Sequence, residues 1–407
     1  MTKICIVICC FVYSWSAFGN SMLIPMDDHQ HNHLKAYGLA YFMLQRQTEV
    51  DWLLNYRGGS FLFSYSAEAE TECKLRGISY EIISAAKVNT LLNEISSPAV
   101  NMNVVRLEKV PRIAVYSPKS DFIQDETDAV LLVLEYAEIP FDIIYDEEIH
   151  NNALARYDWV HLHHEDFTGQ PARARWRESA MLEYQTQETT AGRLGYSSVP
   201  AMKLEVAKQL KTFCASGGYL FAMCSAAESI DVALAVNGLD LFELADDEAQ
   251  QQALDYSLSL AFENFVLEPP YSRRFSDINV GRGYGSMGSY FSLFTFSAKW
   301  DIIPSLLTQN HKHIIREFSG LTTAFNRGLV KPEVMILGEN KEAGNVRYMF
   351  NELGKGFWTF YSGHDPEGYP GRGRTATDLN LHPNSPGYRL ILNNVLFPSA
   401  QKKKQKT

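Results

Sequence analysis

The segment from residue 201 to about residue 226 constrains the fold more than any other part of the sequence. An amphipathic helical pattern over 201–215 ends at Gly217-Gly218. The apolar run 219–223 follows at once, has the length of a buried strand, and leads into a second helix near residue 226. A buried strand between two helices is typical of a parallel sheet that helices cover. The sequence therefore predicts an α/β fold.

The same alternation of helices and strands occupies the region from residue 20 to residue 110. Its pattern predicts helices at 31–45, 67–76 and 84–95, strands at 50–54, 78–83 and 102–108, and a short apolar run at 61–63. Alternating helices and strands favour a parallel or mixed sheet. We therefore expect an N-terminal α/β portion over 20–110.

A second unit begins at Pro111 and is expected to extend to residue 400. Strands are predicted at 112–116, 141–145, 159–162, 334–337, 346–350 and 356–361, and helices at 126–137 and 386–396. Between about 240 and 330 the alternation is lost, which predicts a long insertion. We expect a parallel-centred sheet flanked by helices, followed by a basic, solvated tail at 401–407.

The first nineteen residues have the pattern of a signal peptide. A basic start is followed by an apolar run over 4–18 of about fifteen residues, which is short for a membrane span. Small residues at Ala17 and Gly19 predict cleavage before Asn20 and export to the periplasm or the medium. A buried first strand is the alternative explanation of the run. No later apolar run approaches the roughly 20 residues of a spanning helix, so no membrane span is expected.

Net charge restricts the classes of partner, and the cysteine content restricts the disulfides that the chain can form. The net charge is −10 and no basic stripe is present outside the tail, which argues against a nucleic-acid partner and favours a small-molecule substrate. Cys73, Cys214 and Cys224 remain after removal of the signal peptide. Three thiols cannot all pair, so at least one is free. No oligomeric state follows from the sequence.

Cys224 is the first candidate catalytic residue. It follows the apolar strand 219–223 directly and precedes the small residues Ser225-Ala226-Ala227 of the next helix. A nucleophile projects well from such a sharp turn, and the N-terminus of the helix would stabilise both a thiolate and an oxyanion. The alternative is a buried structural thiol at a strand end, since cysteine is among the most buried residue types.

His364 is the second candidate. It follows a predicted strand and Gly363, and Asp365 and Glu367 lie one and three residues further on. An imidazole with a carboxylate to orient it can act as a general base. A histidine in a turn formed by Gly363 and Pro366 is the alternative. Because ligands of open α/β sheets bind at the carboxyl ends of strands, we expect Cys224 and His364 at the same edge.

These two segments resemble a known family. Gly-Gly-Tyr-Leu-Phe-Ala-Met-Cys-Ser-Ala-Ala-Glu-Ser, ending at Ser229, is similar to the Gly-Gly-Gly-Phe-x-Gly-x-His-Ser-Ala-Ala-Asp-Thr segment of ThuA-like domains. The stretch 360–367, with the helix from Gly387, resembles their closing Phe-Tyr-x-x-x-Gly-His-Asp-Pro-Glu segment. ThuA-like domains belong with class I glutamine amidotransferases, which share a flavodoxin-like sheet.

The resemblance covers about 111–397 apart from insertions and implies roles for particular residues. It implies that Cys224 is the nucleophile, His364 the base and Glu367 its orienting acid. Two positions depart from the pattern: most ThuA-like domains have His where Cys224 stands, and true amidotransferases space His and Glu two residues apart rather than three.

The whole chain also resembles exported bacterial proteins that carry the label asparagine synthetase B. The resemblance includes the turn 55–60. The motifs do not support that activity. A Cys nucleophile directly after the initiator Met and a Ser-Gly-Gly-x-Asp-Ser loop for ATP are both missing from the sequence.

Three weaker candidate sites remain. His161, His163 and Glu165 lie at the end of a predicted strand with a spacing of two, which suits Zn²⁺ or another divalent ion or, alternatively, a polar strand end. Arg57, Gly58, Gly59 and Ser60 form either an anion cradle or an ordinary turn. Arg273 and Arg274 lie in the insertion, which is either a lid over a substrate or a surface subdomain.

Together these patterns favour an exported hydrolase-like protein that acts through Cys224 and His364 on a small amide or a carbohydrate-linked substrate. The alternatives are a metal-dependent hydrolase that uses the cluster at 161–166 and a catalytically silent ligand-binding domain.

Overall fold

The structure is a computed structural model of the 407-residue chain. It describes residues 20–117, 128–162, 165–171, 178–239, 253–269, 272, 274–281, 290–301, 303–308, 312–320, 322–368 and 376–400. The predicted signal peptide and basic tail lie outside these residues, as do His163 and Arg273 and part of the predicted insertion. Those predictions therefore remain predictions.

The N-terminal unit contains a five-stranded sheet with the order β4-β1-β3-β2-β5. Its elements are β1 Ser21–Ile24, α1 His33–Gln45, β2 Val50–Leu54, β3 Ser60–Ser64, α2 Ala67–Arg76, β4 Glu81–Ile83, α3 Ala85–Ser96 and β5 Asn103–Leu107. Every strand pair is antiparallel, so the expectation of a parallel or mixed sheet is wrong for this unit. The turn between β2 and β3 spans only 55–59, too short for the crossover that parallel neighbours require.

The larger sheet has ten strands in the order β11-β10-β13-β14-β15-β9-β8-β6-β7, with β12 paired to β14. They are β6 Ile113–Tyr116, β7 Asp142–Ile144, β8 Trp159–Leu162, β9 Tyr219–Met223, β10 Tyr290–Leu293, β11 Ile314–Arg316, β12 Phe325–Asn326, β13 Met335–Asn340, β14 Asn345–Leu353 and β15 Gly356–Tyr361. Strands β15, β9, β8, β6 and β7 are parallel, and the others are antiparallel. The protein is therefore α/β with a mixed-direction sheet, and the predicted insertion contributes β10, β11 and β12 to it.

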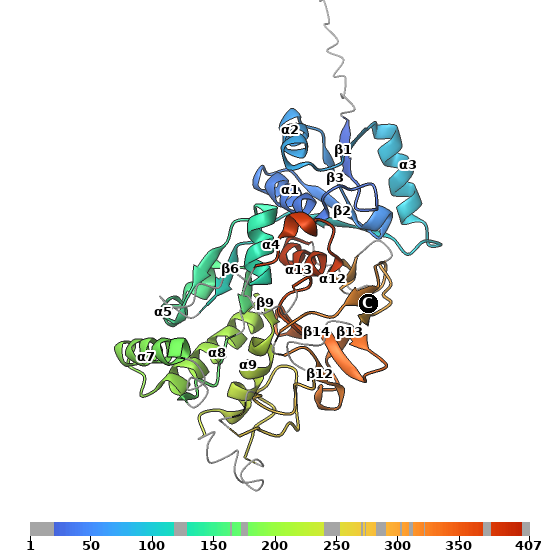
Figure 1. The fold of residues 1–407 in the computed structure, drawn as a ribbon. Coiled ribbons are helices and arrows are strands. Elements are labelled where there is room, and N and C mark those ends of the chain that lie inside the picture. The colour runs from blue at the N-terminus through green and yellow to red at the C-terminus, as the bar shows by residue number, and fades with distance from the viewer. Residues whose placement is uncertain are drawn as a thin grey trace, which may run out of the picture.

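Helices cover both faces of this sheet (Figure 1). On one face lie α4 Ala129–Ala137 and α13 Pro386–Leu396, together with α1 and the short α12 Pro304–Leu307. On the other lie α8 Val199–Ala215 and α9 Ser225–Val236, with α5 Asp146–His150 and α7 Glu178–Arg193 against α8. Short 3-10 turns occur at Tyr56–Gly58, Ala153–Arg156, Arg327–Leu329, Leu379–Leu381 and Phe397–Ser399. Along β9 the side chains alternate between the two cores, with Phe221 on the α13 side and Leu220 on the α8 side.

Helix α1 joins the N-terminal unit to the rest of the molecule. It is buried on almost every side and packs against α4 and α13. A Cβ on Gly38 would lie 1.7 Å from the carbonyl oxygen of Ala137, so only glycine permits this approach. The hydroxyl of Tyr37 donates to Asn393 Oδ1 at 2.5 Å. The N-terminal unit is therefore packed into the same core as α13.

Two buried acids of α9 hold the predicted insertion against the sheet. Asp231 accepts hydrogen bonds at 2.7–2.9 Å from the backbone N–H groups of residues 260, 261 and 262. Glu228 accepts bonds from the backbone and hydroxyl of Ser276 and from the hydroxyl of Thr322. All twelve residues of α9 are buried, which its apolar sequence permits.

Within the part of the chain that the structure describes, no helix combines the length and apolar character that crossing a bilayer requires.

Candidate functional site

Cys224 is the single residue between β9 and α9, and its backbone is strained. Its φ of 55° and ψ of −136° lie in a region that L-residues rarely adopt. The small residues Ser225, Ala226 and Ala227 form the first turn of α9, where the backbone N–H groups have no partner within the helix. A cysteine in such a strand-to-helix turn has the backbone geometry of a nucleophile elbow. The residue is 2% exposed.

The loop that carries His364 leaves the sheet beside Cys224. Strand β15 runs parallel to β9, and Tyr361 is paired with Met223 at the end of both strands. The residues that follow, Cys224 and 362–364, therefore lie at one edge of the sheet, where the strand pattern predicts them. Gly363, at φ +84°, donates its N–H to the carbonyl of Thr322 at 2.6 Å. His364 itself is half-buried.

Asp365 and Glu367 connect this loop to the start of α13. Asp365 Oδ1 accepts bonds at 2.9 Å from the hydroxyl of Tyr388 and from the N–H groups of residues 367 and 368, while Oδ2 accepts from Thr377 at 2.5 Å. Glu367 accepts from Ser385 at 2.7 Å and lies 3.5 Å from His382 Nδ1. These contacts give both acids a role in shaping the loop, and the orientation of His364 by either acid remains a prediction.

The described residues of the proposed metal cluster have separate partners. His161 is fully buried in β8, with Nδ1 3.2 Å from the carbonyl of Phe221 and Nε2 3.2 Å from Asp128 Oδ2. Glu165 lies beyond the end of β8 and pairs with Lys203 of α8 at 3.0 Å. No group of three or more metal-ligating side chains occurs among the described residues, from which His163 is missing. This geometry gives the metal prediction no support.

Glu165 instead belongs to a buried charge cluster that the sequence patterns do not single out. Lys203 Nζ lies 3.0 Å from Asp146 Oδ2, 3.0 Å from Glu165 Oε1 and 2.9 Å from the hydroxyl of Tyr116. Burial raises the pKa of Glu165 to about 7, although Lys203 opposes the shift. The sequence does contain a signal for this cluster: Lys203 lies on the apolar face of the helix, one position after Met202 and three before Val206.

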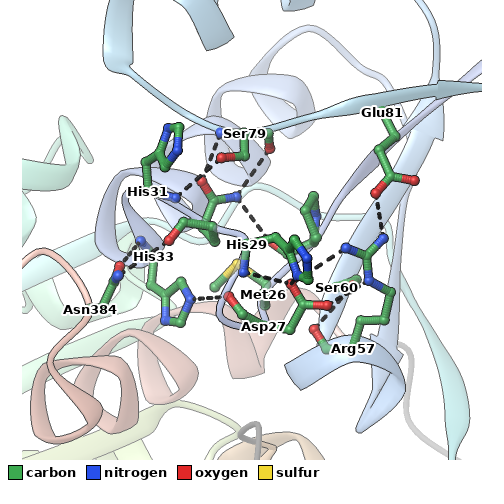
Figure 2. A network of polar contacts seen from close by, with 12 residues as sticks. Met26, Asp27, His29, His31, His33, Arg57, Ser60, Ser79, Glu81 and Asn384 are labelled. Atoms are coloured by element: carbon green, nitrogen blue, oxygen red, sulfur yellow. Dashed lines mark hydrogen bonds and ion pairs between the residues drawn. The ribbon is translucent and has the colours of Figure 1, made fainter.

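The turn Arg57–Ser60 holds together parts of the N-terminal unit (Figure 2). Arg57 pairs with Asp27 and Glu81, each at 2.6 Å. Ser60 donates to turn carbonyls, and the carbonyl of Gly59 accepts from Trp52. A Cβ on Gly59, at φ +89°, would lie 2.7 Å from the hydroxyl of Thr308. Because these groups are already bonded within the protein, the turn offers no support for the predicted anion cradle.

The arginines proposed in the insertion are only partly described. Arg274 is exposed, and its backbone N–H donates to the hydroxyl of Ser272 at 3.2 Å. Arg273 lies outside the described residues. A role of this pair in binding a substrate remains a prediction.

Comparisons with known proteins assign neither a family nor an activity to the chain. No model of a protein family matches the chain, and no curated protein matches it either. Two cytoplasmic proteins from Salmonella typhimurium are similar in structure. One is 8% identical, covers 72% of this chain and 100% of its own, and has a TM-score of 0.37; the other is 12% identical, covers 71% and 99%, and has a TM-score of 0.38.

A catalytic mutant of a β-galactosidase from G. stearothermophilus is also similar over part of its length. It is 13% identical, the match covers 62% of this chain and 27% of that one, and the TM-score is 0.27. Similarities at this level carry no argument about family or activity.

Proposed function

We propose that the protein is a thiol-dependent amide hydrolase of the class I glutamine amidotransferase-like, ThuA-like type. The backbone of Cys224 is the observation that carries this proposal, since a non-glycine residue at φ 55° and ψ −136° is strained. Strain of this kind clusters at active sites, where it helps to expose a nucleophile. The parallel pairing of β9 with β15 adds support, because it puts the His364 loop at the same edge.

In this mechanism Cys224 Sγ attacks the carbonyl carbon of a small amide, which includes the amide of a carbohydrate-linked molecule. His364 accepts the thiol proton, and the N–H groups of the first turn of α9 bind the oxyanion. His364 then returns the proton to the departing amine as the thioester forms. Water hydrolyses the thioester, giving the acid and restoring the thiol.

Thiol labelling tests the proposal with controls built into the chain. Burial raises the pKa of both Cys73 and Cys214 to about 12, so these thiols should stay inert to iodoacetamide in the folded protein. Cys224 should react well below pH 8.5, roughly the unperturbed pKa of a thiol. His364→Ala should slow this labelling while the circular dichroism spectrum stays unchanged. Inert Cys224 in the native protein would remove the nucleophile from the proposal.

A ligand-binding domain without catalysis is the second candidate, and two observations favour it. Cys224 is only 2% exposed, and oxygens of Asp365 and Glu367 accept bonds from Thr377 and from Ser385 at the start of α13. Under this alternative Cys224 is labelled only after denaturation, and His364→Ala leaves its reactivity unchanged.

We also propose that the chain is exported. Strand β1 begins at Ser21, so cleavage before Asn20 leaves the described fold whole. Intact mass measurement of the protein from a periplasmic or culture fraction should give a chain that begins at Asn20, and a retained Met1 would contradict export by this route.

A further inference from the structure

A cavity of about 420 Å³ opens between the N-terminal unit and the C-terminal half of the chain. Asp28 and His33 line it from the N-terminal unit, Lys312 and Arg316 from the β11 segment, and Arg389 from α13. Small-molecule sites commonly have volumes of 300–1,000 Å³, so this cavity is large enough for a ligand of roughly that class. None of these residues belongs to the edge that carries Cys224.

Arg389 forms the buried floor of the cavity and has an incomplete set of partners. It is 1% exposed, and its Nη1 and Nη2 donate to the carbonyls of Met26 at 3.3 Å and Gly58 at 2.6 Å. Its Nε–H has no acceptor among the described residues, and no described carboxylate forms an ion pair with it. Neutral carbonyls do not cancel a charge, so a buried guanidinium of this kind favours a negatively charged partner.

His33 lies beside Arg389 as a neutral ring. Because Arg389 Nη1 can only donate, His33 Nδ1 must accept this bond at 3.2 Å. The proton of the neutral ring therefore sits on Nε2, which donates to the carbonyl of Asp27 at 3.0 Å (Figure 2). Burial, and after it the charge of Arg389, lowers the pKa of His33 to about 3. At neutral pH the ring carries no charge, so it neither adds to the positive charge of Arg389 nor neutralises it.

The rim of the cavity is also cationic. Lys312 and Arg316 are exposed, and neither forms an ion pair with a described carboxylate. Among the described lining residues Asp28 is the one carboxylate, so three cations against one anion give this part of the site a charge of about +2 in a chain of net charge −10. Ile314 and Pro386 add apolar surface between these charges.

We propose that this cavity binds a small organic oxyanion, a carboxylate or a phosphate, with its charged group over Arg389 and between Lys312 and Arg316. The apolar part of the ligand contacts Ile314 and Pro386. Arginine is suited to this task because its planar guanidinium offers several donors to one oxyanion. The proposal goes beyond the thiol chemistry of Cys224 and stands without it.

The test compares three anions at matched ionic strength: inorganic phosphate, malonate and chloride. Phosphate, malonate or both should raise the Tm of the wild-type protein in a saturable way and give a binding isotherm by calorimetry. Phosphate alone identifies a phosphorylated ligand, malonate alone a carboxylate, and both a general oxyanion site. An equal effect of chloride, or no isotherm with either oxyanion, would overturn the proposal.

Charge-reversal variants locate the binding. Lys312→Glu combined with Arg316→Glu should weaken binding about tenfold or more, as expected for the loss of charge-assisted contacts. Lys87→Glu combined with Lys208→Glu makes the same charge change at exposed positions of α3 and α8 and should keep wild-type affinity. Equal affinities of the two double variants would refute the assignment to this cavity.

Arg389→Met removes the charge of the floor and retains an apolar side chain of comparable length. Because Arg389 also bonds the carbonyls of Met26 and Gly58, this variant is used only if its circular dichroism spectrum matches the wild type. A folded Arg389→Met protein should show no oxyanion isotherm, and unchanged binding would count against the proposal. If Arg389→Met does not fold, the comparison of the two charge-reversal double variants tests the proposal by itself.

Discussion

The ammonium group of Lys203 is enclosed by two carboxylates and a phenol, away from solvent. Burial raises the pKa of Glu165 to about 7, because the one lysine that it shares with Asp146 does not offset the cost of burying the carboxylate. The folded protein therefore keeps a proton on Glu165 that the unfolded chain releases near pH 4.5. The contribution of Glu165 to stability is complete below that pH and is lost as the pH rises to about 7.

Glu165→Gln should remove this dependence. Between pH 4.5 and pH 7, the free energy of unfolding of the wild type should fall relative to that of the variant by about 1–3 kcal/mol. Urea unfolding at half-unit pH steps measures the difference. Asp231, whose burial raises its pKa to about 6, is present in both proteins and cancels in the comparison. Parallel curves for the two proteins would show that Glu165 is ionised throughout.

The strain at Cys224 makes a second prediction at this scale. Glycine adopts the backbone of residue 224 without the clash that a Cβ creates, whereas alanine does not. Cys224→Gly should therefore be more stable than Cys224→Ala by about 1 kcal/mol, after allowing for the greater flexibility of unfolded glycine. Denaturant midpoints of the two variants give the comparison, and a more stable alanine variant would mean that the turn relaxes.

At the scale of elements, helix packing depends on one close contact between α1 and α4. Gly38→Ala would put a methyl group against the carbonyl of Ala137, and the helices must separate to admit it. We expect a loss of stability of about 1–3 kcal/mol or more. Gly192→Ala in α7 is the matched control, because a Cβ there meets no atom within 4 Å, and it should stabilise the protein by about 0.5–1 kcal/mol. Thermal unfolding that ranks the two variants in the reverse order would contradict the packing of α1.

The elements also show what the sequence could predict. Strands β9 and β15 have the predicted bounds because each is a compact apolar run beside Gly residues, and helix α13 has them because Pro386 marks its first turn. The antiparallel direction of the N-terminal sheet was not predictable from periodicity, since direction depends on which strands become neighbours. The position of Cys224 and His364 at one edge of the sheet could be predicted, because the end of an apolar strand is recognisable from the local sequence. The cavity around Arg389 could not, since its lining comes from four separate segments of the sequence.

At the scale of the whole molecule, the C-terminal end of the described chain is bonded to the end of the N-terminal unit. The N–H of Glu108 donates to the carbonyl of Ser399 at 3.1 Å, and Leu107 forms an isolated bridge with Ala400. The apolar surface of α1 is buried against α4 and α13 rather than within its own unit alone. We therefore expect the N-terminal unit to depend on the second unit for its stability.

A fragment of residues 20–110 should lack a cooperative thermal transition, since much of α1 would be exposed to water. A chain of residues 20–400 should unfold in one transition when followed by circular dichroism and by tryptophan fluorescence. A sigmoidal transition of the fragment alone would show that the N-terminal unit is an independent domain.

The bonds from Arg389 also bear on the order in which the protein can fold during its synthesis. They reach Met26 and Gly58 across 363 and 331 positions of the chain. A ribosome releases the N-terminal sheet long before it makes the helix that completes its packing. Contacts of such long range form late and slowly, and the waiting segment exposes apolar surface in the meantime. Nascent chains shorter than about 390 residues are therefore the stage at which a chaperone would have most to bind.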